Sequence, residues 1–210
     1  MTTNDQVAPE VDGRAEAGAP PAADRPAATA PRRRTWLATL AALALLTCMA
    51  VAMVTTAVQQ TPTIDEPVYV GAGASYLHHH SLRLNPEHPP LGKLVVGAGL
   101  QVAGIHLAPG VEGNQQQVGQ HLIYDSGHDP YRVMLAARLP MIVLTLLFGV
   151  VVFAFGRDLA GAWGGLVALA LYAFSPDVIA HGSLATLDVP AAGTSSVASD
   201  PCAITSGEKA

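Results

Sequence analysis

The chain has 210 residues, of which half are hydrophobic and 13% are charged, and its formal net charge is −5. This length is enough for one domain or for a few membrane helices. The only dense basic cluster is the arginine triplet at residues 32–34, so the charge pattern speaks against a nucleic-acid-binding protein. Two cysteines, Cys48 and Cys202, make no disulfide framework.

The hydrophobic residues are concentrated in three runs without a charged residue, which cover residues 35–64, 139–156 and 159–176. A helix needs roughly 20 apolar residues to cross a hydrocarbon core of about 30 Å, and it satisfies its own backbone hydrogen bonds there. The first run is ample, and the other two hold 18 residues each. We therefore expect an all-α integral membrane protein with about three transmembrane helices, at residues 36–58, 133–156 and 160–174.

The segment before the first helix, residues 1–34, is rich in Ala, Pro, Asp and Arg. It has too few large apolar residues to offset its chain entropy, so we expect a disordered tail. The arginine triplet predicts that this tail is cytoplasmic, and the length of tail and apolar run favours an uncleaved signal anchor. In this multi-pass cell-membrane topology, the loop at 59–132 is extracytoplasmic and a short turn at Arg157 and Asp158 is cytoplasmic.

Residues 91–107 carry an apolar stripe at helical spacing. They also contain Lys93, Gln101 and four glycines, so we expect an amphipathic helix that lies in the membrane interface within the long external loop. The alternative is that this segment spans the membrane, which would put Asp65 and Asp188 on opposite sides.

Two adjacent carboxylates, Asp65 and Glu66, follow the first predicted membrane helix. Such groups can act as a general base or a cation ligand. The same residues fit a capping box, with Thr63 as the N-cap, Glu66 three residues later and Pro67 in the first turn. The two interpretations can coexist if Glu66 caps the helix while Asp65 points elsewhere.

Two histidine-containing segments of the external loop are further candidates. Glu87 and His88 lie in a proline-rich stretch at residues 85–91, where restricted backbone angles would hold them in fixed directions; the alternative is a rigid connector. The run at residues 78–80 is three consecutive histidines. Consecutive helical residues point to different faces and a metal site needs directed ligands, so we expect a structural or surface role for this run.

Two more candidates flank the later apolar runs. Arg138 opens the second predicted membrane helix, where it would either snorkel to the interface or bind the phosphate of an anionic lipid. Asp188 begins what the pattern predicts to be another membrane segment, where an unpaired acid is costly. The alternative for Asp188 is a helix N-cap.

Taken in chain order, these elements resemble the GT-C superfamily of glycosyltransferases, especially the family of protein O-mannosyltransferases and bacterial aminoarabinose transferases of lipid A. The shared features are an Asp-Glu pair, a Glu-His-Pro-Pro-Leu element with a nearby lysine, an Arg-Leu-Pro, and a Ser-Pro followed by His-Gly-x-x-Ala-Thr-x-Asp. They occupy residues 65–66, 87–93, 138–140 and 175–188. The resemblance covers about residues 36–190, with Thr186-Leu187-Asp188 where the family often has Thr-Thr-Asp.

The resemblance implies an enzyme that transfers a sugar from a polyprenyl-phosphate donor to a hydroxyl of a lipid, glycan or protein, outside the cytoplasm and with inversion. It implies Asp65 as the general base, with Glu66 and Asp188 as further acids of the catalytic site. The residues that would bind substrate are Glu87, His88, Lys93 and Arg138. No cofactor is certain; a divalent metal is one option, with Glu87 and His88 as candidate ligands.

A competing hypothesis is a small non-enzymatic membrane protein whose His-rich external loop binds metal. A transporter half is disfavoured because transporters carry polar groups within their helices. After Asp188 the family pattern requires another membrane helix, but Asp200 and Pro201 interrupt the apolar residues. We therefore expect residues 191–210 to be an irregular tail left by truncation or a frameshift, and the glycosyltransferase part, residues 35–190, to be incomplete and inactive by itself.

Overall fold

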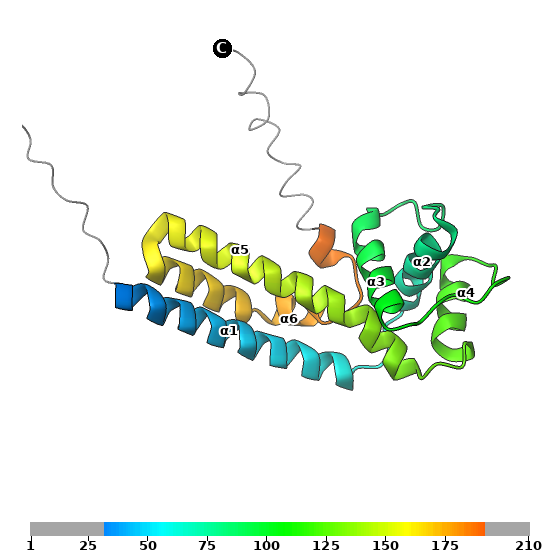
Figure 1. Ribbon diagram of the computed structural model, residues 1–210, viewed down its shortest axis with the longest axis horizontal. Coiled ribbons are helices and arrows are strands. Elements are labelled where there is room, and N and C mark those ends of the chain that lie inside the picture. The colour runs from blue at the N-terminus through cyan, green and yellow to red at the C-terminus, as the bar shows by residue number, and fades with distance from the viewer. Residues whose placement is uncertain (1–31, 192–210) are drawn as a thin grey trace, which may run out of the picture.

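The computed structural model describes residues 32–191, and this part of the chain is helical with no β-strand (Figure 1). The elements are α1 (Arg32–Gln59), α2 (Glu66–His79), α3 (Pro90–Val102), α4 (Gln115–Gln120), the π-helical turn η1 (His121–Asp125), α5 (Pro130–Ala173) and α6 (Pro176–Gly182). The expected all-α class is confirmed for these residues. The expectations for residues 1–31 and 192–210 lie outside the described part.

Two helices, α1 and α5, are long and apolar enough to cross a membrane. The most apolar 18-residue stretch within Trp36–Gln59 of α1 has a mean hydropathy of 2.4, and the most apolar 18-residue stretch within Pro130–Ala173 of α5 has one of 2.5. Both helices expose large apolar side chains, among them Leu43 and Val51 on α1 and Leu147, Val151 and Phe155 on α5. A continuous exposed surface of this kind marks contact with lipid or with another protein.

Helix α5 is a hairpin of two arms, because Ala160 and Gly161 have non-helical backbone angles. Gly161 has a φ of 72°, which glycine adopts without steric cost. The arms, residues 130–159 and 162–173, run side by side in opposite directions (Figure 1), and the Tyr172 hydroxyl donates to the Thr145 carbonyl at 3.0 Å. Helix formation continues through Arg157 and Asp158, so the expected turn there is wrong by a few residues.

The shorter elements α2, α3, α4 and η1 gather where α1 ends and α5 begins (Figure 1). Glycines let α2 approach its neighbours closely: a Cβ on Gly71 would lie 2.1 Å from the Gln115 carbonyl oxygen, and one on Gly73 would lie 2.5 Å from the Lys93 carbonyl oxygen. The apolar core beneath them includes Val70, Val96, Leu100, Ile123, Val133, Ala137 and Met141.

Helix α3 is too short to cross a bilayer. Its 13 residues give a length of roughly 20 Å at about 1.5 Å per residue, against a hydrocarbon core of about 30 Å. The helix expected at residues 91–107 ends early because Gly104 turns the chain with a φ of 73°. Val96 and Leu100 face the core shared with α2 and α5.

Candidate functional site

A buried ion pair joins the start of α2 to the first arm of α5. Arg138 donates from Nε to Oε1 of Glu66 at 2.8 Å and from Nη2 to Oε2 at 2.7 Å. The side chains of Arg138 and Glu66 are 1% and 0% exposed. This two-point geometry is the strong form of a charge-assisted hydrogen bond.

The rest of the Arg138 guanidinium holds the chain that leaves α1. Its Nη1 donates to the carbonyls of Ala57 (2.6 Å) and Gln60 (2.9 Å), and its Nη2 donates to that of Thr61 (3.1 Å). These bonds engage the five N–H groups that a guanidinium possesses. Arg138 therefore does not snorkel to the interface and has no N–H group left for a substrate phosphate in this conformation.

Glu66 also fixes the segment that follows α6. Its carboxylate accepts from the backbone N–H of Ala185 at 2.9 Å and from that of Thr63 at 2.9 Å. Burial raises the pKa of Glu66, but the hydrogen bonds from Arg138, Ala185 and Thr63 outweigh burial, and the net pKa lies below the usual 4.5. The Glu66 carboxylate is thus a charged anchor: it joins the chain before α2, the first arm of α5 and the segment after α6.

The expected capping box forms only in part. Thr63 donates its backbone N–H to Glu66, but the Thr63 hydroxyl has no partner. The N-cap of α2 is Asp65, with Pro67 in the first turn. The expectation of Thr63 as N-cap is wrong, because the helix begins at Glu66, whose side chain is directed to Arg138 instead.

The negative charges of two exposed carboxylates, Asp65 and Asp188, both affect the pKa of the Tyr69 phenol. Burial raises the pKa of Tyr69, and the negative charges of Asp65 and then Asp188 raise it further. Tyr69 lies one turn into α2 from Asp65, its backbone N–H donating to the Asp65 carbonyl at 3.3 Å. The two acids are far apart in sequence, and the hydrogen bond from Ala185 to Glu66 holds the segment before Asp188 at the start of α2.

His181 supports Asp188 from the end of α6. Its Nδ1 lies 2.9 Å from Asp188 Oδ2, and its Nε2 lies 3.4 Å from Asp177 Oδ1. The sequence motif contained His181, but its role was not predicted, and neither was that of Tyr69. The available signals were the i, i+4 spacing of Asp65 and Tyr69 and of Asp177 and His181, which puts each pair on one helical face.

Lys93 is buried and organises the turn at residues 85–88. Its Nζ donates to Tyr76 Oη (3.1 Å), to the His88 carbonyl (3.0 Å) and to both oxygens of Asn85. The three N–H groups of an ammonium are used by these acceptors. Lys93 therefore holds the turn and does not reach the surface as a substrate-binding residue.

The turn that Lys93 holds presents Glu87 and His88 to solvent. The His88 ring meets Tyr69 edge-on, with 6.3 Å between centroids, and its Nδ1 pairs with Asn85 Oδ1 at 3.0 Å. His88 thus joins the group of side chains around Tyr69. Glu87 is exposed on the same turn and has no polar contact within residues 32–191.

Within the described residues there is no group of three or more His, Cys, Asp or Glu side chains that could hold a metal ion. Glu87 and His88 have no third protein ligand there, so the metal at this position stays a prediction. His78 and His79 are exposed with their rings edge-on at 4.6 Å, an arrangement of packed rings and not of directed ligands.

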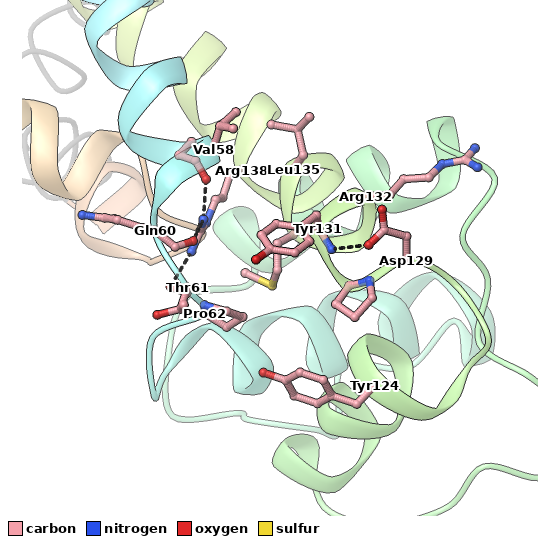
Figure 2. A pocket seen from close by; sticks show the side chains of 13 residues that line it. Val58, Gln60, Thr61, Pro62, Tyr124, Asp129, Tyr131, Arg132, Leu135 and Arg138 are labelled. Atoms are coloured by element: carbon pink, nitrogen blue, oxygen red, sulfur yellow. Dashed lines mark hydrogen bonds between the residues drawn. The ribbon is translucent and has the colours of Figure 1, made fainter.

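A separate cavity of about 670 Å³ lies between the end of α1, the turn η1 and the start of α5 (Figure 2). Tyr124 and Tyr131 extend into this region, with Pro62 and Leu135 on its walls (Figure 2). The full lining is Ala57, Val58, Gln60, Thr61, Pro62, Tyr124, Asp129, Pro130, Tyr131, Arg132, Met134, Leu135 and Arg138.

Comparison of this chain with protein-family models, with curated proteins and with solved structures finds no match. Two exposed carboxylates beside a phenol and an imidazole can accept a proton from a hydroxyl group and can hydrogen-bond a polyhydroxylated molecule.

Proposed function

We propose that this chain belongs to a membrane glycosyltransferase that moves a sugar from a polyprenyl-phosphate donor to a hydroxyl acceptor on the extracytoplasmic side, with inversion. The observation that supports this proposal is that Asp65 and Asp188 both lie near enough to Tyr69 for their charges to raise its pKa, while the Tyr69 ring contacts His88 and a long apolar helix ends just before Asp65. Carboxylates at a membrane surface can reach a hydroxyl acceptor in water and a donor whose chain stays in lipid.

The proposed topology has three spans, which are α1 and the two arms of α5. The first arm, residues 130–159, is 30 residues long. The second arm, residues 162–173, is 12 residues long, and it forms the third span together with residues 174 and 175 and α6. The loop elements α2 to η1 and the segment ending at Asp188 then share one side of the membrane, and Arg157 lies on the other. The N-terminus is cytoplasmic on this proposal, by the positive-inside rule.

In the proposed reaction, Asp65 is the general base. It accepts the proton of the acceptor hydroxyl while that oxygen forms a bond to the anomeric carbon, and the bond from that carbon to the donor phosphate oxygen breaks on the opposite face. The polyprenyl phosphate leaves with the electron pair of this bond. The exposure of Asp65 leaves its carboxylate accessible to an acceptor, which general-base catalysis requires.

The remaining residues divide into those that face the substrates and those that position them. Asp188, oriented by His181, is proposed to bind the sugar or the acceptor. His88 is the basic side chain exposed beside Tyr69 and is proposed to face the donor phosphate. Glu66 is reassigned from a catalytic acid to a positioning residue because Arg138 and two backbone N–H groups occupy its carboxylate.

The test is sugar transfer by membranes of cells that carry the gene in its native genomic context. Radiolabelled sugar on a polyprenyl phosphate is supplied, and incorporation into lipid, glycan and protein fractions is measured. We expect donor-dependent incorporation that Asp65→Asn abolishes and that Glu112→Gln, a change at an exposed acid elsewhere in the loop, leaves intact. Incorporation that is unchanged when the gene is deleted would overturn the proposal.

A further inference from the structure

The cavity beside Tyr131 has the walls of a site for a hydrocarbon chain. Ala57 and Val58 from α1 and Met134 and Leu135 from α5 line it, together with two prolines. Its volume of about 670 Å³ falls within the roughly 300–1,000 Å³ of typical ligand pockets, which are mostly apolar with few polar groups. The proposed sugar-transfer chemistry does not use this cavity.

The cavity is continuous with the apolar flank of α5. Leu135 on its wall is followed at four-residue intervals by Leu139, Val143, Leu147 and Val151, which are 41% to 60% exposed. Residues four apart are neighbours on a helix, so these side chains form an inclined ridge along α5 that begins at the cavity. A chain in contact with this ridge can enter the cavity without crossing water.

The rim of the cavity carries two exposed tyrosines and one charge of each sign. Tyr124, on the π-helical turn η1, and Tyr131, at the start of α5, have the amphipathic character typical of the membrane–water interface. Arg132 engages one N–H group, from Nη2 to the Ala103 carbonyl at 3.1 Å. Asp129 Oδ1 accepts from the Tyr131 backbone at 3.1 Å. No ion pair joins Arg132 to Asp129 in the described part of the chain.

We propose that this cavity binds a zwitterionic phospholipid of the outer leaflet, with an acyl chain on the Leu135 wall, the phosphate toward Arg132 and the ammonium toward Asp129. The opposite charges at the rim complement such a headgroup. An anionic lipid, a polyprenyl phosphate included, would leave Asp129 facing a second negative charge. This inference rests on the membrane placement of α1 and α5 in the proposed function and is independent of sugar transfer.

Native mass spectrometry of the purified full chain tests the site with phosphatidylethanolamine and phosphatidylglycerol of identical chains. We expect phosphatidylethanolamine to be retained several-fold better. Leu135→Trp, which enlarges a wall side chain, should reduce this retention at least threefold, whereas Leu171→Trp on the exposed second arm should not. Asp129→Asn keeps the capping oxygen for α5 and should remove the preference for phosphatidylethanolamine.

The proposal would be overturned if Leu135→Trp and Leu171→Trp retained phosphatidylethanolamine equally well. It would also be overturned if the wild type retained phosphatidylglycerol or a polyprenyl phosphate better than phosphatidylethanolamine.

If Leu135→Trp does not fold, wild-type chain in vesicles is photolabelled by phosphatidylethanolamine with a diazirine on its acyl chain. Labels should concentrate at residues 57–62 and 124–135, and an even spread along α1 and α5 refutes the site. Carbonate extraction of membranes separates the failure of the lipid site from the failure of the membrane placement. If the chain stays in the membrane but does not retain phosphatidylethanolamine selectively, only the lipid site is contradicted.

Discussion

Two neighbouring carboxylates at the start of α2 have opposite environments, and this contrast sets their roles. Asp65 is exposed, and its negative charge acts on Tyr69. Glu66 is fully buried and has its charge compensated by Arg138. A buried charge without its partner is costly, whereas an exposed carboxylate remains available for chemistry.

Glu66→Gln is expected to destabilise the folded chain by about 3–5 kcal/mol, the usual cost of breaking a buried ion pair from one side. The amide keeps the shape of the side chain but leaves the Arg138 guanidinium without a counter-charge. Reversible unfolding in mixed detergent and dodecyl sulfate micelles measures the change. A loss below about 1 kcal/mol would show that Glu66 is not the anchor described above.

Asp65→Asn provides the matched comparison one residue away. Because the Asp65 side chain is exposed and makes no capping hydrogen bond, we expect the free energy of unfolding to change by no more than about 0.5 kcal/mol. Sugar transfer should nevertheless be lost, since an amide accepts a proton poorly. Near-normal transfer by this variant in the membrane assay would remove Asp65 from the role of base.

Lowering the pH should reduce the contribution of Glu66 to the stability of the folded chain. The pKa of Glu66 is lower in the folded chain than its ordinary value of 4.5, so its stabilising contribution is present above that value and is lost as the pH falls through the folded pKa. We expect wild-type stability to decline below about pH 4.5, and Glu66→Gln to lack this part of the decline. Parallel pH dependence of the two proteins in the unfolding assay would contradict the assignment.

At the level of the elements, glycine determines how closely α2 packs against α4. A Cβ added to Gly119 would lie 1.8 Å from the Pro67 carbonyl oxygen, and one added to Gly71 would lie 2.1 Å from that of Gln115. Both obstacles are backbone atoms, which cannot rotate away as side chains do. The two helices can therefore cross at this distance only with glycine at the contact.

Gly119→Ala should cost at least the 1–3 kcal/mol or so that is typical of overpacking, because the helices have to separate to admit the methyl group. The control is Gly104→Asn, at a position with open space and a φ of 73°, which asparagine tolerates better than most residues. Thermal unfolding of both variants compares them. If Gly119→Ala proves no less stable than Gly104→Asn, the close crossing is not maintained in the protein.

At the level of the whole molecule, the elements separate into a long apolar part and a compact end made of the shorter helices. The hairpin α5 returns along its own first arm beside α1, so the segment that ends at Asp188 comes back to the elements that carry Asp65 and His88 (Figure 1). The turn after Arg157 lies at the opposite end of the same hairpin. This arrangement makes the proposed topology directly testable.

Cysteine labelling with a membrane-impermeant maleimide should label Glu87→Cys in intact cells and Arg157→Cys only after lysis. The natural cysteines, Cys48 and Cys202, are replaced by serine to remove background. The reason is that the turn at 85–88 and residue 157 lie at opposite ends of the apolar helices. Labelling at 157 without labelling at 87 in intact cells would invert the proposed topology and remove the site from the extracytoplasmic side.

The sequence by itself determined the helical class and the approximate positions of the apolar helices, because these depend on local hydrophobicity and length. It also indicated Asp65, His88 and Asp188 as polar residues outside those helices. Only the tertiary structure decided that Glu66, Lys93 and Arg138 are buried. Glu66 binds Ala185 and Arg138 binds Ala57, both far away in the chain, and Lys93 binds Asn85 across a turn. A charged side chain looks the same in sequence whether it faces water or a partner, and long-range packing alone distinguishes the two.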